Sequence, residues 1–385
     1  MKLAFQLAYR NLIGAGLRTW LTVSVLSFAF VVIIFYNGLL DGWNEQAKRD
    51  TIAWEYGKGQ LLHPNYNPYD PFSLQDAHGV FPNAEKQNLV PVLIRSTSLY
   101  PQGRMIGAML KGIDVNQHIL KLPTQRLKES TAPVPAIIGK RMAASTKLKV
   151  GDEVLIRWRD KNGTFDASNI TIVEIFDCNV PTVDMGQIWI SIDKLWNMTG
   201  LQNHATIYIN GTSASPTDMA GWKFKSQTDL LKDITDIIAM KRVSGSIMYL
   251  LFLAIALLAI FDTQVLSVFR RQREIGTYIS LGMTRAQVVG IFTVEGSMNS
   301  LLATTLGCIY GIPLFIYISY TGIPMTKASQ NIGLAVAERI FPVYGVGLIL
   351  GTILLVVLSS TIVSFLPSRK IATMNPVDAL KGKVQ

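Results

Sequence analysis

The sequence RRQREIG, residues 270–276, places three arginines in four positions and follows them with a carboxylate, Glu274. This stretch lies between two long uncharged runs, and a second carboxylate, Glu295, directly precedes the third uncharged run. Basic residues beside an apolar run fix the side of the membrane on which they stay. The chemistry that these residues predict on their own is a charge signal that sets the orientation of the neighbouring spans.

Signatures of nucleotide hydrolysis, metal catalysis and acyl transfer are missing from the sequence. No G-x-x-x-x-G-K-[ST] loop occurs, so we expect this chain not to bind ATP through a P-loop. No H-E-x-x-H or G-x-S-x-G motif is present. We therefore expect no catalytic residue, no metal site and no cofactor in this chain. We interpret the four histidines as scattered surface or packing residues: His63, His78, His118 and His204.

Glu295 is followed by 31 uncharged residues, and two interpretations of this carboxylate remain. An ionisable group inside a membrane span is costly and often functional. Alternatively, Glu295 lies at headgroup depth, about 15 Å along a helix from Arg285, and bonds a neighbouring helix end or a basic side chain. We favour the second interpretation.

The composition indicates a protein that is partly embedded in a membrane. Of the 385 residues, 49% are hydrophobic and 16% are charged, which is too apolar for an ordinary soluble enzyme. Each of four charge-free runs exceeds or approaches the roughly 20 residues that span a bilayer. The runs are 19–40, 243–261, 296–326 and 340–368.

The segment between the first two runs, residues 41–242, has ordinary soluble-domain chemistry, with 23 basic and 21 acidic residues. The fold class that follows is a membrane protein with four transmembrane helices and a large extracytoplasmic mixed α/β domain inserted between helices 1 and 2. We predict these segments: a cytoplasmic amphipathic segment (1–18), TM1 (19–40), a periplasmic domain (41–242), TM2 and stalk (243–269), a cytoplasmic coupling region (270–287), TM3 (288–320), an extracytoplasmic loop (321–342), TM4 (343–366) and a cytoplasmic tail (367–385).

Charge sets the orientation. The N-terminal segment, the 270–285 turn and the C-terminal tail together carry eleven Lys and Arg against two acidic residues. The positive-inside rule places these segments in the cytoplasm and residues 41–242 outside it. The excess charge is juxtamembrane, which argues against a nucleic-acid partner. We expect a retained first span, the alternative being a cleaved signal peptide, and a free Cys178 and Cys308.

Local patterns predict the elements that hold the basic turn. The stretch 243–281 contains no helix-breaking residue and is predicted to be one helix, capped by Gly282. Thr284 and Gln287 form a capping box that begins the next helix. Asn375 and Pro376 begin a short C-terminal helix. In the third and fourth runs, small residues repeat every four positions, which predicts packing between these two spans in preference to a homodimer seam. The rows are Gly296, Ser300 and Thr304, then Ala303, Gly307 and Gly311, and in the fourth run Gly347 and Gly351.

The alternation of apolar residues in the inserted domain predicts strands at 59–64, 105–114, 152–158, 170–176, 187–192 and 205–210. It predicts helices at 138–148, 193–198 and 226–241.

Several of these stretches resemble the ABC-transporter permease superfamily that contains the macrolide exporters, the cell-division protein FtsX and the lipoprotein-releasing permeases. The resemblance covers nearly the whole chain and its order of four spans. Its motifs are AYRNLIGAGLRTWLT (8–22), IIGKRMAASTKLKVGDEVLI (137–156), RQREIG (271–276), SLGMTRAQVV (280–289), VEG (294–296) and PSRKIATMNPVDAL (367–380).

The resemblance implies mechanotransmission: two permease subunits pair, two ATPase subunits holding ATP and Mg²⁺ dock beneath them, and ATPase closure moves the stalk and the outer domains. The basic turn and the C-terminal helix would then contact the ATPase. The implied coupling residues are Arg271, Arg273, Glu274, Ile275, Gly276, Leu281, Gly282, Pro376 and Val377.

The stretch YGKGQLLHPNYNPYDPF (56–72) is similar to the lipoprotein-releasing branch, whose first two spans form a groove for acyl chains. That branch implies a lipoprotein substrate and a periplasmic carrier, and a multi-pass protein of the inner membrane with both termini cytoplasmic. RDKNGTFDASN (159–169) is a short turn where one branch member has a carrier-recruiting hook. A peptide or drug exporter and a non-transporting relay remain alternatives, as do homodimer and heterodimer. The implied groove residues are Phe35, Tyr36, Leu39, Leu40, Ile247, Leu250 and Leu251.

Overall fold

The structure is a computed structural model that describes most of the chain. The chain forms two compact units. A helical unit comprises residues 1–43, 238–323 and 341–385, and an α/β unit comprises residues 44–237 and 324–340. The predicted amphipathic segment up to residue 16, and the C-terminal helix with Pro376 and Val377, lie outside the described residues. The described residues are 17–82, 84, 87–212, 214–216, 219, 221–325 and 337–373.

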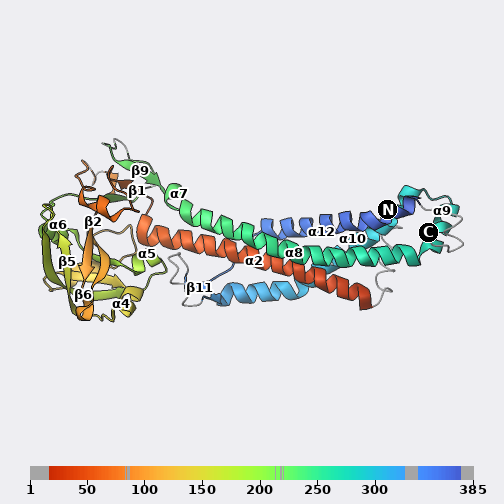
Figure 1. The fold of residues 1–385 in the computed structure, drawn as a ribbon, viewed down its shortest axis with the longest axis horizontal. Coiled ribbons are helices and arrows are strands. Elements are labelled where there is room, and N and C mark those ends of the chain that lie inside the picture. The colour runs from red at the N-terminus through yellow and green to blue at the C-terminus, as the bar shows by residue number, and fades with distance from the viewer. Residues whose placement is uncertain are drawn as a thin grey trace. The chain divides into compact units, whose positions relative to one another are not determined.

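Within the described residues, four helices are long and apolar enough to cross a membrane, which confirms the predicted number of spans. These helices are α2 (Leu17–Thr51), α8 (Lys232–Arg270), α10 (Arg285–Thr321) and α12 (Val346–Ser368) (Figure 1). The α/β unit enters the chain between the first and the second of them, as predicted.

The first of these helices, α2, supplies the centre of the helical unit. In the most apolar stretch of α2, 61% of the residues are buried. The corresponding stretches of the other three helices are 17–22% buried. Leu26, Phe30 and Ile34 of α2 form one apolar cluster with Ile260 of α8 and Val356 of α12. The other helices therefore pack around α2 and keep outward apolar faces, as helices in lipid do.

The predicted single helix over 243–281 is wrong, because the helix breaks at Arg271. Helix α8 ends at Arg270, and Arg271 leaves the helical conformation with φ −102° and ψ 19° before α9 (Gln272–Ser280) begins. No glycine or proline marks this break. The side chain of Arg271 is instead bonded to two carboxylates, and these tertiary contacts override a local pattern that favours a continuous helix.

The predicted turn after α9 is confirmed. Gly282 has φ +96°, a conformation that glycine adopts at no steric cost. The amide of Met283 donates to the carbonyl of Tyr278 at 3.1 Å, which closes the turn around the helix end. Thr284 and Gln287 then cap α10 reciprocally, as their spacing predicts.

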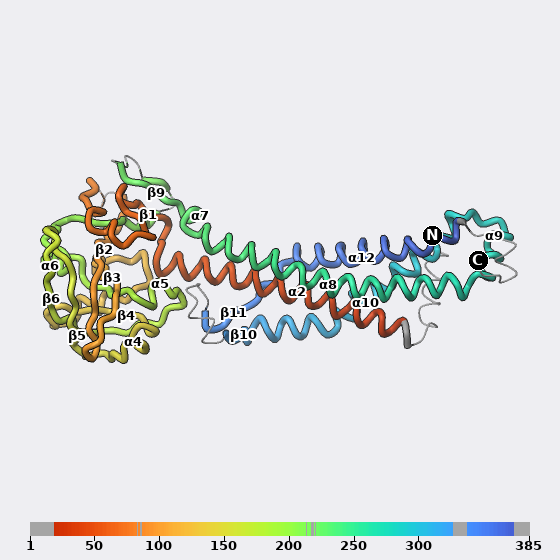
Figure 2. The backbone as a smooth tube through the Cα atoms, in the orientation of Figure 1, coloured from red at the N-terminus to blue at the C-terminus, as the bar shows by residue number. Residues whose placement is uncertain are grey.

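The α/β unit is built on a nine-stranded sheet in the order β3-β7-β4-β6-β5-β2-β8-β1-β9. Strands β2 to β6 are labelled in the tube of Figure 2. Because β2 also pairs with β3, six of the nine strands close into a ring. The strands are β1 (Gly59–Leu62), β2 (Leu89–Leu99), β3 (Ile106–Ile113), β4 (Pro135–Gly139), β5 (Glu153–Arg159), β6 (Phe165–Phe176), β7 (Gln187–Ser191), β8 (Ile207–Asn210) and β9 (Lys223–Ser226). A separate pair is formed by β10 (Ile323–Pro324) and β11 (Arg339–Ile340).

Alternate residues of the sheet enter two different apolar cores. Leu110 and Ile188 belong to one core, whereas Trp189 belongs to the other. Short helices cover these cores and connect the strands. They are η1 (Ile52–Tyr56), η2 (Pro71–Gln75), η4 (Pro101–Gly103), α3 (Gln125–Glu129), α4 (Lys140–Thr146), α5 (Pro181–Asp184), α6 (Ile192–Thr199) and α7 (Gln227–Leu230).

All six predicted strands are present, but the sequence missed β2, β4 and β9. Residues 138–139 were predicted as the start of a helix, yet they end β4, and α4 begins only at Lys140. The predicted helix 226–241 is divided at Leu231 into α7 and the start of α8. The turn between β5 and β6 spans 160–164, so a long hook is absent there, as predicted.

Candidate coupling corner

Arg271 joins three helices at the break between α8 and α9. Its Nε donates to Glu274 Oε2 of α9 at 2.6 Å, and its Nη1 donates to Glu295 of α10 at 2.8 and 3.1 Å. The guanidinium also lies over the ring of Phe292, 4.8 Å from its centroid. Such planar, multiply bonded recognition of carboxylates is specific to arginine. The interpretation of Glu295 as a carboxylate bonded to a basic side chain is therefore confirmed.

An apolar cluster supports this ionic contact from beneath. Ile275 of α9 and Phe292 of α10 are fully buried, and they pack with Val268 of α8 and with Ile371 of the short helix η5 (Arg369–Thr373). In addition, Arg285 Nη1 donates to the carbonyl of Ala372 at 2.7 Å. The corner, which we define as residues 268–292, is therefore fixed to the end of the fourth spanning helix as well.

The predicted coupling residues divide into an inner and an outer group. Ile275 and Gly276 are buried and hold the corner together. Arg273 is exposed, and Leu281 is 78% exposed at the turn. The added Cβ of a residue at Gly282 would meet no described atom within 4 Å. The outer face of the turn is thus free of contacts within the described chain and available to a partner.

Polar side chains buried in the helical unit lie beside this corner. Gln264 of α8 and Asn299 of α10 each carry an amide oxygen without a hydrogen-bond partner among the described residues. The hydroxyls of Ser360 and Ser364 on α12 are in the same state. Sequence analysis missed these residues, because each is isolated in an apolar run and they come together only through helix packing.

Gly296 is the point at which α8, α10 and α12 approach one another most closely in this polar cluster. A Cβ on Gly296 would lie 2.3 Å from Ser364 Oγ and 2.9 Å from Gln264 Nε2. Contacts this short do not occur, so a larger residue must separate the helices. The predicted packing of the third span on the fourth is confirmed at this position.

The other small residues behave differently. A Cβ on Gly307 would meet Phe30 of α2 at 2.7 Å, so this part of α10 packs on α2. Gly347 and Gly351 of α12 would meet no described atom within 4 Å. The predicted packing role of these two glycines within the chain is wrong for the described residues, because the face that they form points away from the other helices.

The predicted groove residues lie on α2 and α8, and their placement leaves the groove a prediction. The ring of Tyr36 occupies the space over Gly245, and its hydroxyl donates to the carbonyl of Lys241 at 2.9 Å. Leu40 is 5% exposed, and Phe35 packs against the α2 core. Four residues of the set are partly or largely exposed: Leu39, Ile247, Leu250 and Leu251.

Two histidines that the sequence leaves scattered are neighbours in the α/β unit. The Nδ1 atoms of His78 and His204 lie 2.9 Å apart, and burial lowers the pKa of His78 to about 4, with smaller effects of Arg95 and His204. One neutral ring donates to the other, which fits a packing role. In the part of the chain that the structure describes, no group of three or more His, Cys, Asp or Glu could hold a metal ion.

Part of the helical unit, including the corner, matches a known family. Residues 246–376 match the FtsX-like permease C-terminal family. The chain is 23% identical over 252 residues to the lipoprotein-releasing system transmembrane protein LolC of Xylella fastidiosa strain Temecula1, covering 57% of this chain and 59% of that protein. It is 22% identical over 325 residues to LolC of strain 9a5c, covering 75% and 76%.

A third relative belongs to the exporters. The chain is 24% identical over 320 residues to the macrolide export ATP-binding/permease protein MacB 2 of Aeromonas hydrophila, covering 77% of this chain and 46% of that protein. Among solved structures, the extracellular domain of the ABC-type transporter YknZ from Gram-positive bacteria aligns at 14% identity with a TM-score of 0.25, covering 46% of this chain and 94% of that domain.

Four helices of the described chain are long and apolar enough to cross a membrane, and the matched segment covers α10, α12 and residues 246–270 of α8. Residues 246–376 are thus similar to the FtsX-like permease C-terminal family, and the chain is similar to LolC and MacB proteins at 22–24% identity.

We expect Gly296→Ala to loosen the packing of α8, α10 and α12, because the new methyl group has no space beside Ser364. The cost should be about 1–3 kcal/mol of unfolding free energy, the usual range for overpacking. Gly351→Ala on the open face of α12 is the matched control and should be neutral or slightly stabilising. Thermal unfolding of both variants in nanodiscs measures the difference. Equal melting temperatures for Gly296→Ala and Gly351→Ala would contradict the close approach at Gly296.

Proposed function

We propose that this chain is the permease subunit of an ABC transporter that extracts lipoproteins from the outer leaflet of the cytoplasmic membrane by mechanotransmission. ATP would be hydrolysed by two copies of a separate P-loop ATPase, which hold the ATP and Mg²⁺. The observation that carries the proposal is the corner itself, a rigid element inside the FtsX-like segment whose outer face is open. The two relatives named as lipoprotein-releasing proteins support the choice of substrate.

The corner suits force transmission because its attachments differ on its two faces. On the inner face, Arg271 and Ile275 fix α9 to α8 and α10. On the outer face, Arg273 and Leu281 are exposed and offer one charged and one apolar contact to an ATPase surface. A partner that moves this face would move the ends of α8 and α10 with it. The predicted contacts of Pro376 and Val377 with the same partner stay a prediction.

A second candidate function is the export of peptides or drugs, which the similarity to MacB 2 favours. A third is an FtsX-like signal relay to a cell-wall hydrolase without transport, for which the FtsX-like family match is the support. Mass spectrometry of ligands retained by the purified complex separates the three. An acylated protein supports lipoprotein release, a peptide or small molecule supports export, and a retained hydrolase without cargo supports the relay.

The proposed assembly contains a second permease subunit, either identical or different, and it has both termini and the corner in the cytoplasm. Asn162 in the exposed β5–β6 turn is a suitable reporter of sidedness. With the two native cysteines replaced, Asn162→Cys should react with an impermeant maleimide in intact spheroplasts, whereas Arg273→Cys should react only after lysis. The reverse pattern would contradict the positive-inside assignment and place the corner outside the cell.

We expect the purified chain alone to hydrolyse no ATP and to stimulate hydrolysis only in complex with the ATPase subunits that co-purify with it. Gly282→Val should reduce this stimulation severalfold, because a β-branched residue strains a backbone with φ +96° and tilts the turn. Gly351→Val on the open face of α12, outside the corner, is the matched control and should keep normal stimulation. ATPase assays at matched expression check both variants.

Hydrolysis by the chain alone would reject a separate ATPase subunit. Full stimulation by the Gly282→Val variant would remove the turn from the coupling pathway and leave its arginines with a topological role only.

A further inference from the structure

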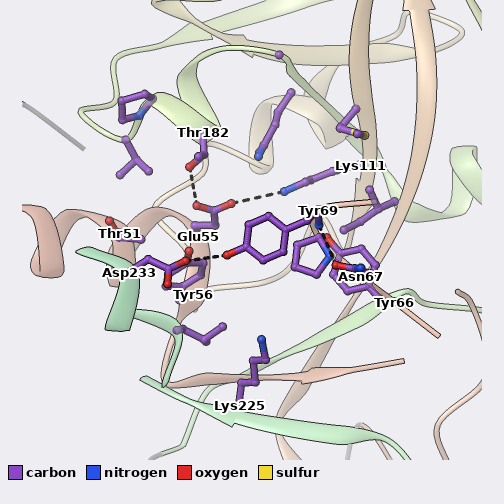
Figure 3. A pocket seen from close by; sticks show the side chains of 18 of the residues that line it. Thr51, Glu55, Tyr56, Tyr66, Asn67, Tyr69, Lys111, Thr182, Lys225 and Asp233 are labelled. Atoms are coloured by element: carbon purple, nitrogen blue, oxygen red, sulfur yellow. Dashed lines mark hydrogen bonds and ion pairs between the residues drawn. The ribbon is translucent and has the colours of Figure 1, made fainter. Parts of the chain in front are cut away.

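A cavity of about 850 Å³ lies within the α/β unit, and none of the proposed functions uses it. Its walls come from the end of the first long helix, the loop 66–71, strands β3 and β7, the α5 turn and the first residues of α8 (Figure 3). A smaller chamber of about 120 Å³ shares Lys111 and Tyr66 with it and reaches Trp189. The main cavity alone has the size of sites that bind drug-sized molecules.

The floor of the cavity is polar, although it is buried. Strands β3 and β7 run parallel, with Met109 opposite Gln187 and Lys111 opposite Trp189, so these four side chains share one face of the sheet. Gln187 is 7% exposed and Trp189 is 1% exposed. Among the described residues, Gln187 Oε1 and Trp189 Nε1 have no hydrogen-bond partner. A buried acceptor and a buried donor each need a partner, and a ligand in the adjoining cavity and chamber can supply both.

Lys111 adds a positive charge to the cavity. The carboxylate of Glu55 balances this charge without forming a hydrogen bond to it. Its Nζ lies 3.9 Å from Glu55 Oε1, beyond hydrogen-bond distance, and 4.9 Å from the centroid of the Trp189 ring. Thr182 donates to the other oxygen of Glu55 at 2.7 Å, and Figure 3 shows Glu55 between Thr182 and Lys111. Burial lowers the pKa of Lys111, while Glu55 opposes this shift. Because Glu55 balances the charge, a neutral dipolar group fits beside Lys111 better than a second anion.

The remaining walls are apolar and aromatic. Ile94, Leu74 and Val180 line one part, and Ile234 and Ile237 of α8 line another. The ring of Tyr66 lies at the cavity, and burial raises the pKa of its hydroxyl to about 12, so it stays neutral. Apolar walls around a few placed polar groups are typical of ligand sites that select one functional group and one hydrophobic part.

One contact closes the cavity on the α8 side. The hydroxyl of Tyr69, from the loop 66–71, donates to Asp233 Oδ2 at 2.8 Å (Figure 3). Tyr69 is 81% exposed, so the loop 66–71 is held to α8 by a surface hydrogen bond that a ligand can displace. Glu55 and Asp233 belong to the domain ends of the two helices that continue into the first and second predicted spans.

We propose that this cavity, together with the smaller chamber that Lys111 and Trp189 line, binds a peptide amide that carries an apolar side chain. The carbonyl oxygen of the amide accepts from Lys111 and Trp189, its N–H donates to Gln187 Oε1, and the side chain packs against Ile94 and the α8 wall. A hydrocarbon alone leaves all three polar groups unpaired, and an ester has no donor for Gln187. The inference deepens the proposed function, since a peptide segment of the cargo fits the same site, but its test needs no ATPase subunit.

The test titrates the full-length chain in nanodiscs with N-acetyl-leucyl-leucine N-methylamide and follows heat release by calorimetry. We expect saturable binding to the wild type and a loss of affinity of about tenfold or more in Gln187→Leu and in Lys111→Met, as for removal of one buried hydrogen bond. Gln187→Leu removes an unpartnered buried acceptor, so its melting temperature should equal or exceed that of the wild type. The surface variants Gln202→Leu and Lys194→Met are the matched controls and should bind normally.

Two further probes identify the functional group that is recognised. Octyl acetate, an apolar ester, and octanoate, an apolar anion, should each bind at least about tenfold more weakly than the amide. Equal binding of octyl acetate would show a hydrophobic cavity without amide recognition and overturn the proposal. Tighter binding of octanoate that depends on Lys111 would show an anion site and overturn it as well. Wild-type affinity in a stably folded Gln187→Leu variant, or no binding of the amide to the wild type, has the same consequence.

Discussion

The guanidinium of Arg271 is held between two carboxylates and one aromatic ring at the point where α8 stops being helical. Each of these partners lies on a helix that follows the break: Glu274 lies on α9, whereas Glu295 and Phe292 lie on α10. A partly buried charge that loses its partner costs several kcal/mol, so the three helix ends keep this arrangement. The turn with Gly282 is thereby positioned by the ion pair as well as by its own backbone conformation.

The same residues connect the corner to the interior of the helical unit. Glu295 bonds Arg271, and its neighbour Gly296 lets Ser364 of α12 and Gln264 of α8 approach α10 without a side chain between them. The ion pair and the close approach therefore involve consecutive residues in one turn of α10. A displacement of α9 would act on α8 and α10 through Arg271 and Glu295, and on η5 through the apolar cluster around Ile275. The proposed role of the corner in coupling rests on these contacts.

The sequence was sufficient for features that depend on local patterns. Four uncharged runs predicted the four long helices, and Gly282, Thr284 and Gln287 predicted the turn between α9 and α10. The break at Arg271 escaped prediction because its cause is a contact with Glu295, 24 residues later. Strand β2 escaped because Pro91 lies within it, and proline usually argues against a strand with neighbours on both sides.

The corner and the cavity were predictable to different degrees, because the sequence shows local patterns but not contacts between distant residues. Arg271, Glu274 and Glu295 stand out individually as charges beside apolar runs, although their mutual contact does not follow from spacing. In the α/β unit, Lys111 and Gln187 lie 76 positions apart and become neighbours only because β3 and β7 pair in parallel. No periodicity in either strand marks such a pair, so a buried polar floor of this kind is found only in the folded chain.

A double-mutant cycle on Arg271 and Glu295 tests the central claim most directly. The unfolding free energy of the full chain is measured for the wild type, Arg271→Met, Glu295→Gln and the double variant, in a membrane mimetic that permits reversible unfolding. The account predicts a coupling energy of about 1.5 kcal/mol or more, because the double variant removes both charges and leaves neither one unpaired. Arg270→Met, one position away and exposed, should show no coupling to Glu295→Gln. Additive effects of Arg271→Met and Glu295→Gln, within about 0.5 kcal/mol, would contradict the claim that this ion pair holds the corner.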